Sequence, residues 1–256
     1  MPRQVPRQEP PDTQHRSPNH TERRGVDPPD MVVLHYTGME SCDAAIARLC
    51  DPAAEVSAHY VVDIDGTTFA LVDEHERAWH AGRSSWGGVV DVNSHSIGIE
   101  IVNPGHGLGY PPFPEPQMQA VEIRLTLIME RWSIPPERVV GHACIAPGRK
   151  IDPGEKFDWR RLAQRGLAVW LDPLIEDNSA PDATGQSDLF RAAAERIGYA
   201  VPDQSEWSPE LLDVWQAFAM RFLPGQAGRE PSATGVAHAK RIAERWPCID
   251  PALANT

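Results

Sequence analysis

The sequence lacks any apolar run long enough to serve as a membrane span or as the core of a secretory signal. Its first 30 residues are instead rich in Pro and polar residues, a composition that predicts a disordered tail over residues 1–30. We therefore expect a cytoplasmic protein, with the periplasm as the alternative if a signal has been trimmed from the chain. We expect no role within a membrane.

Cysteines are few, and their spacing matches no zinc-knuckle or redox motif. The four are Cys42, Cys50, Cys144 and Cys248. Cys42 and Cys50 lie in one predicted helix, where a rise of about 1.5 Å per residue separates them by roughly 12 Å, beyond disulfide reach. We expect reduced thiols, which favours the cytosol.

A surplus of positive charge is also missing, because the formal net charge is −12 at pH 7. Such a surface repels nucleic acid and anionic lipid, so we expect neither as a partner. The hydrophobic fraction of 41% and the charged fraction of 23% are typical of a soluble globular protein. With 256 residues, the chain has room for one large domain or for two of ordinary size. The sequence does not indicate an oligomeric state.

Apolar segments bounded by turn residues predict strands over residues 31–37, 59–72, 96–103 and 138–143. The second segment is interpreted as two strands joined at Asp65-Gly66, a dipeptide typical of two-residue hairpin loops. Residues 115–136 carry apolar side chains at helical spacing and end at two prolines. Strands interleaved with helices predict a mixed α/β domain over residues 31–170, with a central sheet flanked by helices.

The rest of the chain is predicted to be helical. Residues 171–182 contain turn residues without periodicity, which predicts a linker. Residues 183–250 show three helical segments and are expected to form a small all-α three-helix domain, with Gly198 ending the first helix and Ser208 beginning the second. One face of the second helix is apolar, which we interpret as a bundle core rather than a ligand site: Leu211, Trp215, Phe218 and Phe222.

Three residues with metal-binding side chains stand where predicted strands end and loops begin: His35, His142 and Asp152. A rigid strand end can hold a ligand with the accuracy that a metal requires. Two imidazoles and one carboxylate suit zinc, and three protein ligands leave the fourth position open, as in catalytic sites. The separation of the two histidines matches no short metal motif, and spacing alone leaves competing candidates: His59, His80, His95 and His106.

Separated blocks of the sequence carry a family resemblance: VVLHYTG, SAHYVVDIDGT, AWHAGRSSWGG, NSHSIGIEIVN and GHACIAPGRKIDPGEKFDW. In this order and spacing they resemble the zinc-dependent N-acetylmuramoyl-L-alanine amidases, a family that includes phage lysozyme-like amidases and animal peptidoglycan recognition proteins. The resemblance covers residues 31–170. Residues 183–247 resemble the three-helix peptidoglycan-binding domain that some members carry.

The resemblance implies a role for each candidate residue. It implies that Zn2+ is held by His35, His142 and Asp152. It further implies that Glu100 is the general base and that Lys150 stabilises the transition state. A base must take a proton from the attacking water and pass it to the departing amine, and a fixed cation offsets the developing oxyanion. Candidates for the groove that binds sugar and peptide are Trp79, His80 and Asn103.

The sequence departs from the family pattern at two positions. Members usually have an acidic residue at the position of Cys144, so this thiol could change the support of the metal ligands or bring a soft ligand near the metal. Branches without the glutamate use a tyrosine at the position of Ala58. The expected base chemistry therefore depends on Glu100 alone.

The resemblance thus implies a zinc amidase that cleaves the bond between the lactyl group of N-acetylmuramic acid and the L-Ala of the stem peptide. The missing signal favours a soluble 1,6-anhydro-muropeptide in recycling, whereas a wall-binding helical domain favours intact peptidoglycan. Two alternatives remain: a non-catalytic peptidoglycan-binding or sensing protein, and a lytic endolysin that acts on intact wall. A complete ligand set argues against the first, and the relative activity on sacculi and fragments tests the second.

Overall fold

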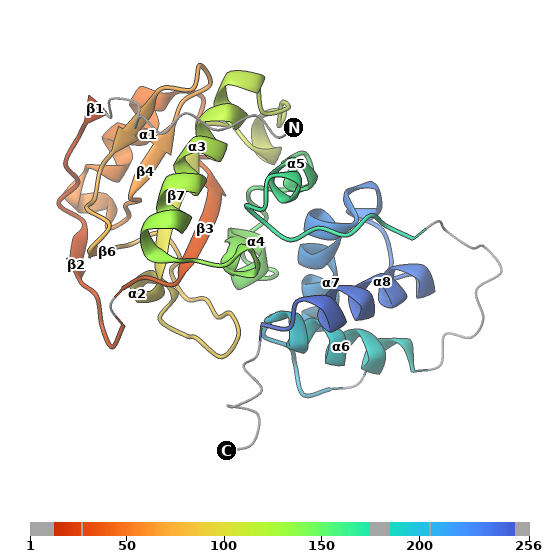
Figure 1. The fold of residues 1–256 in the computed structure, drawn as a ribbon. Helices are drawn as coiled ribbons and strands as arrows, with labels where there is room; N and C mark the ends of the chain where they lie inside the picture. Colours follow the sequence, from red (N-terminus) through yellow and green to blue (C-terminus); the bar gives the residue numbers. More distant parts are fainter. Residues whose placement is uncertain (1–12, 27, 175–184, 205, 249–256) are drawn as a thin grey trace. The chain divides into compact units, whose positions relative to one another are not determined.

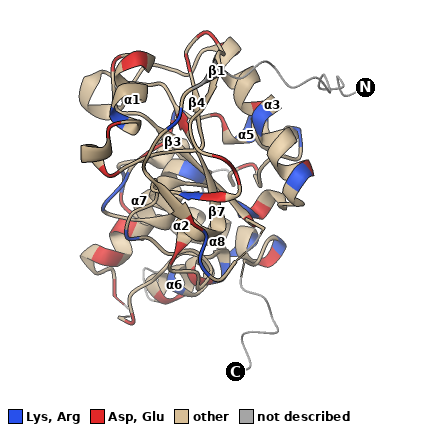
Figure 2. Ribbon diagram, turned by 90° about the vertical axis from the view of Figure 1, so that its left-hand side faces the viewer, with Lys and Arg blue, Asp and Glu red and all other residues tan. Residues whose placement is uncertain are grey.

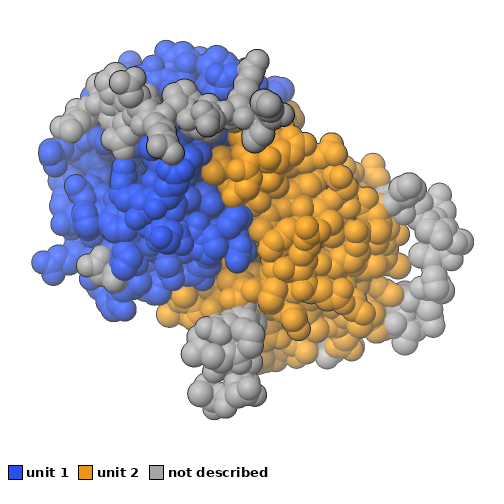
Figure 3. Space-filling model, viewed as in Figure 1, with its two compact units in different colours: residues 1–82, 91–140 blue, residues 83–90, 141–256 orange. Residues whose placement is uncertain are grey.

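The computed structural model describes residues 13–26, 28–174, 185–204 and 206–248. Contacts divide the chain into two compact units, one of residues 1–82 and 91–140 and the other of residues 83–90 and 141–256 (Figure 3). This division differs from the predicted boundary at residues 171–182, most of which lie outside the described residues. The predicted domain boundaries stay a prediction.

A six-stranded mixed sheet forms the centre of the first unit, in the order β1-β5-β4-β7-β3-β8 (Figure 1). β4 pairs with β7 in parallel, β7 pairs with β3 in parallel, and β4 pairs with β5 antiparallel. This confirms the predicted mixed sheet. The strands are β1 (Thr13–Gln14), β3 (Met31–Tyr36), β4 (Tyr60–Val62), β5 (Thr68–Ala70), β7 (Ser96–Ile101) and β8 (Val139–Gly141).

Helices cover both faces of this sheet. Arg124 of α3 (Glu115–Trp132) lies over the ring of Tyr60, 4.2 Å from its centroid. The next residue of β4, Val61, packs in an apolar cluster with α1 (Cys42–Leu49). Because successive residues of a strand point to opposite faces, α3 and α1 lie on opposite sides of the sheet. The predicted α/β arrangement with flanking helices is therefore confirmed.

The predicted turn after β4 is present, but its loop is longer than expected. The amide of Asp63 donates to the carbonyl of Thr67, which leaves three residues, 64–66, in the loop rather than two. Gly66 has a φ of +91°, and a Cβ there would lie 2.8 Å from the carbonyl oxygen of Pro116. The site of the turn was predictable, whereas its length depends on this local backbone geometry.

The predicted disordered tail over residues 1–30 is wrong for its second half. β1 pairs with β5, and β2 (His20–Glu22) pairs antiparallel with β6 (Glu76–Ala78). The buried side chain of Asn19 donates to the carbonyls of Asp51, at 2.9 Å, and of Val56, at 2.8 Å. Hydrogen bonds to the main chain hold this segment, so its polar composition gave no signal of order. Residues 1–12 lie outside the described part of the chain.

The second unit is mainly helical. It contains α4 (His142–Ile145) and α5 (Trp159–Gln164), followed by α6 (Gln186–Ile197), α7 (Pro209–Phe222) and α8 (Ala233–Arg245). The three helices predicted after residue 183 are thus present. Gly198 ends α6, and the hydroxyl of Ser208 caps α7 by accepting from the amide of Leu211. The predicted apolar face of α7 is buried, which supports its interpretation as core.

Acidic and basic residues are interspersed along the ribbon (Figure 2). The net charge of −12 leaves an acidic excess, so the expectation that polyanions are disfavoured as partners stays a prediction. Among the helices that the structure describes, none has both the length and the apolar character needed to cross a membrane.

A buried histidine in α8 makes stability depend on pH. His238 is fully buried, and neither ring nitrogen has a hydrogen-bond partner among the described residues. Burial, with Arg241 nearby, lowers the pKa of His238 from 6.5 to about 4. Because the unfolded chain binds this proton at higher pH than the folded chain, stability is lost as the pH falls below the ordinary histidine value.

We predict that His238→Leu flattens this dependence. The expected loss of unfolding free energy between neutral pH and about pH 4 is on the order of 2–3 kcal/mol for this one group, at about 1.4 kcal/mol per pKa unit. Urea denaturation of the metal-free protein near neutral pH and at lower pH measures it. The exposed His75, changed to Leu, is the control. An unchanged pH dependence in His238→Leu would contradict the assignment.

Candidate metal centre

The structure brings together the three residues predicted as metal ligands. His35 lies near the end of β3, the neighbouring strand in the sheet is β8, and His142 follows β8 directly. His35, His142 and Asp152 each offer one ligand atom, and these atoms lie within 4.8 Å of one another. All three residues are at least 95% buried, with exposed fractions of 1%, 4% and 5%. Two imidazoles and one carboxylate fit a divalent cation, and zinc in particular.

His142 and Asp152 are fixed at the two ends of one loop. The Nδ1 of His142 lies 3.0 Å from the Oδ2 of Asp152. The amide of Ala143 donates to the carbonyl of Asp152 at 2.8 Å, so the main chain holds the two ends as well. Between them, the amide of Lys150 turns back to the carbonyl of Ala146 at 3.0 Å, and Gly148 takes a φ of +72°. The loop is therefore built to hold two donors at one place.

Cys144 is turned towards the helices of the second unit. Its Sγ accepts from the hydroxyl of Tyr199 at 3.6 Å and from Nη1 of Arg221 at 3.8 Å. The guanidinium of Arg221 also lies 4.4 Å from the ring centroid of Trp159. Burial, with Cys144 beside it, raises the pKa of Tyr199 well above its ordinary value. Cys144 is not in the metal-capable group of the described residues. Its contacts with Tyr199 and Arg221 instead help to hold the loop between His142 and Asp152.

Glu100 is positioned next to His35 by strand pairing. In the parallel register of β3 and β7, His35 lies opposite Glu100 and Leu34 lies opposite Ile99. Paired residues in neighbouring strands share one face of a sheet, so the carboxylate and the imidazole are on the same side. Glu100 and Lys150 are both partly buried, and Lys150 stands two residues before Asp152 in sequence. The catalytic roles of Glu100 and Lys150 stay predictions.

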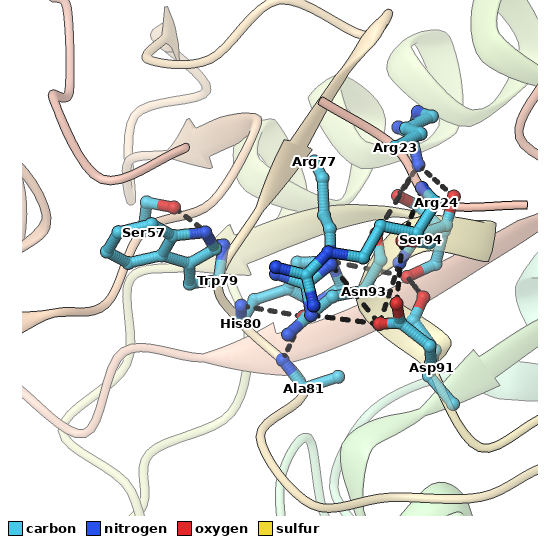
Figure 4. Close-up of polar contacts among 12 residues, drawn as sticks. Arg23, Arg24, Ser57, Arg77, Trp79, His80, Ala81, Asp91, Asn93 and Ser94 are labelled. Carbon is cyan, nitrogen blue, oxygen red and sulfur yellow. Dashed lines mark hydrogen bonds and ion pairs between the residues drawn. The ribbon is translucent and has the colours of Figure 1, made fainter. Parts of the chain in front are cut away.

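The three residues predicted to bind substrate have different surroundings. Asn103 is buried, and its side chain holds its own loop, because Nδ2 donates to Pro111 and Oδ1 accepts from the amide of Gly105. Trp79 is partly buried, and its amide donates to the hydroxyl of Ser57 at 2.8 Å (Figure 4). The Nδ1 of His80 lies 3.0 Å from the Nε2 of His35. Their substrate-binding role stays a prediction.

The remaining histidines have other contacts. His59 is fully buried; its Nδ1 accepts from the amide of Gly98 at 2.9 Å, and its Nε2 donates to the carbonyl of Glu76 at 3.0 Å. Burial and the charge of Arg23 lower the pKa of His59 to about 3. His95 lies 3.2 Å from the carboxylate of Asp30, and His106 stacks on a tyrosine ring. None of the three is in the metal-capable group of the described residues.

We predict that removing any ligand of this group strongly weakens metal binding. Asp152→Ala leaves two buried imidazoles to hold the ion, so the affinity for Zn2+ should fall by roughly 100-fold or more. Competition with a chromophoric chelator measures this affinity. His106 was a competing candidate in the sequence but lies outside the group, so His106→Ala should retain wild-type affinity. Tight zinc binding by folded Asp152→Ala would contradict the site.

Comparisons with known proteins agree with this geometry. The family model described as N-acetylmuramoyl-L-alanine amidase matches residues 25–155. AmiD, an N-acetylmuramoyl-L-alanine amidase of Escherichia coli, is 36% identical over 233 residues, which cover 84% of this chain and 83% of AmiD.

Two solved structures extend the similarity to most of the fold. The complex of Escherichia coli AmiD with the substrate anhydro-N-acetylmuramic acid-L-Ala-D-γ-Glu-L-Lys has a TM-score of 0.74 at 33% identity, covering 89% of this chain and 98% of that chain. AmpDh3 of Pseudomonas aeruginosa, in complex with anhydromuramic pentapeptide, has a TM-score of 0.72 at 29% identity, covering 88% and 96%. With the matching family model and the buried ligand group, these similarities establish that the chain belongs to the N-acetylmuramoyl-L-alanine amidase family.

Proposed function

We propose that the protein is a zinc-dependent amidase that hydrolyses the bond between the lactyl group of muramic acid and the L-Ala of the stem peptide. The observation that carries the proposal is the buried group of His35, His142 and Asp152. Bound there, zinc would supply a Lewis acid for the amide carbonyl and make water a nucleophile at neutral pH. Three protein donors leave a coordination position for these reactants.

Glu100 is proposed as the general base. An amine cannot leave an amide as an anion, so one group must take a proton from the attacking water and return it to the departing nitrogen. Glu100 shares a sheet face with His35, directly opposite it in the β3–β7 register. Ala58, at the position where other branches carry a tyrosine, is fully buried and has no polar side-chain atom. The proton transfer therefore rests on Glu100.

Lys150 is proposed to stabilise the developing oxyanion. A fixed cation lowers the energy of negative charge most effectively where water is excluded. The turn from Ala146 to Lys150 fixes its main chain, and Asp152 is only two residues away. Replacing Lys150 should thus affect turnover more than substrate affinity.

Anhydro-muramyl peptides are the proposed substrates. Two of the structural relatives were solved with such molecules, anhydro-N-acetylmuramic acid tripeptide in AmiD and anhydromuramic pentapeptide in AmpDh3. The likeness extends over 89% and 88% of this chain, which supports a similar substrate. Intact peptidoglycan is the alternative substrate, with a lytic function, if the C-terminal helices bind the wall.

A cytoplasmic location is proposed because the described cysteines are not joined by disulfides. Among the described residues no disulfide joins the four cysteines, and two of them, Cys42 and Cys144, are buried. Burial raises the pKa of the Cys42 thiol to about 12, which keeps it protonated and unreactive. Cell fractionation with an antibody to the protein tests the location, and recovery from the periplasm would overturn it.

The amidase proposal predicts release of stem peptide from an anhydro-muropeptide, detected by mass spectrometry. A chelator should abolish the release, and added zinc should restore it. Glu100→Gln keeps the shape of the side chain but cannot accept a proton, so we expect turnover to fall by roughly 100-fold to 10,000-fold. Lys150→Met should lower kcat by about 100-fold or more while KM changes little.

His75→Gln, at an exposed position of the first unit, is the matched control and should keep full activity. Intact sacculi assayed in parallel separate a recycling enzyme from a lytic one. If zinc-loaded protein released no peptide from either substrate, the protein would be a binding or sensing protein instead.

A further inference from the structure

The ring of His80 lies against the metal ligand His35 and against the sheet. Its Nδ1 is 3.0 Å from the Nε2 of His35, and the two rings meet edge to face with centroids 5.1 Å apart. Beneath it is Gly98 of β7, where an added Cβ would come within 2.5 Å of the His80 ring. His80 is 8% exposed. The glycine thus leaves the space in which this imidazole rests beside the ligand.

The directions of the hydrogen bonds follow from Ser96. Its hydroxyl carries one hydrogen and donates it to the carbonyl of Val92 at 2.5 Å. Towards the Nε2 of His80, at 3.3 Å, the same oxygen can therefore only accept. The hydrogen of a neutral His80 is then on Nε2, and its Nδ1 carries the lone pair.

The same reasoning extends to the ligand. Since Nδ1 of His80 accepts, Nε2 of His35 must donate to it. A neutral His35 with its hydrogen on Nε2 has its lone pair on Nδ1. The series of hydrogen bonds from Val92 through Ser96 and His80 thus selects one of the two tautomers of His35. In that tautomer the nitrogen that can bind a metal is Nδ1.

The main chain around His80 is held just as firmly (Figure 4). The amides of His80 and Ala81 both donate to Oδ1 of Asn93, at 3.0 and 2.8 Å. Asn93 belongs to α2 (Val92–His95), whose cap, Asp91, accepts from the hydroxyl of Ser94 and pairs with Arg77 at 2.9 Å. The main chain that carries the His80 ring is therefore positioned by hydrogen bonds that do not involve a metal ligand.

We infer that His80 is a positioning residue for the metal site: by accepting from Nε2 of His35, it fixes the tautomer and the orientation in which Nδ1 of His35 binds the ion. The inference rests on the proposed role of His35 as a zinc ligand. It gives His80 a role in orienting a metal ligand, whereas the sequence predicted a place in the substrate groove. Outer partners of this kind typically change metal affinity by about 10-fold to 100-fold.

The first test reads the tautomer without metal or substrate. Long-range 1H–15N spectra of the zinc-free protein, at a pH where the imidazoles are neutral, should show His35 with its hydrogen on Nε2. In Ser96→Ala, the Nε2 of His80 loses its acceptor, so a second set of His35 signals with the hydrogen on Nδ1 should appear. A wild-type His35 with its hydrogen on Nδ1 would overturn the inference.

The second test measures zinc affinity by chelator competition. His80→Leu should weaken binding by about 10-fold to 100-fold, whereas His80→Gln, whose amide oxygen can still accept, should lose less. Gly98→Ala displaces the ring without removing a polar atom and should also weaken binding. His75→Gln is the matched control. Unchanged affinity in folded His80→Leu would overturn the inference.

Separate controls show whether each variant is folded and whether the result depends on catalysis. The melting temperature of each variant in chelator shows whether it is folded, and if His80→Leu is not, Ser96→Ala and His80→Gln still decide the outcome. Neither readout requires hydrolysis. Protein that binds zinc in a His80-dependent manner but releases no stem peptide would contradict the proposed amidase while leaving this inference intact.

Discussion

The parallel pairing of β3 with β7 is the constraint on which the site depends. It places His35 opposite Glu100, and Val33 opposite Gly98, on one face of the sheet. A slip of one residue would turn these side chains to the opposite face, since the side-chain period of a strand is two. β8 lies on the other edge of β3 and leads directly into His142. The register of β3 and β7 therefore decides which residues lie beside His35. The buried apolar residues that alternate with these positions along both strands stabilise that register.

The buried histidines of this protein have different surroundings. Among the described residues no carboxylate hydrogen-bonds to His59 or His238, and each has a lowered pKa that keeps it neutral. His142 contacts Asp152, and His35 contacts His80. In the first pair neutrality permits burial, whereas the rings of His35 and His142 each have a nitrogen that can bind a cation.

Strands and helices were predictable from the sequence because apolar periodicity reports which faces are buried. The ligand set was not, since His35 and His142 are far apart in the chain and only the family resemblance selected them from the competing histidines. Order in residues 13–26 escaped prediction because polar side chains such as Asn19 and Arg23 secure it by binding main-chain carbonyls. The place of His80 depends on Ser96 and Gly98, whose arrangement around one ring has no signature in sequence.

Arg221 and Tyr199, both on or beside the C-terminal helices, converge on Cys144, in the segment that begins at one ligand and ends at another. Gly148 of the same segment has no room for a side chain, because a Cβ there would meet the carboxylate of Asp213 on α7. The segment and the helices therefore pack into one interior. The C-terminal helices thus help to hold the segment that carries His142 and Asp152, besides presenting a surface of their own.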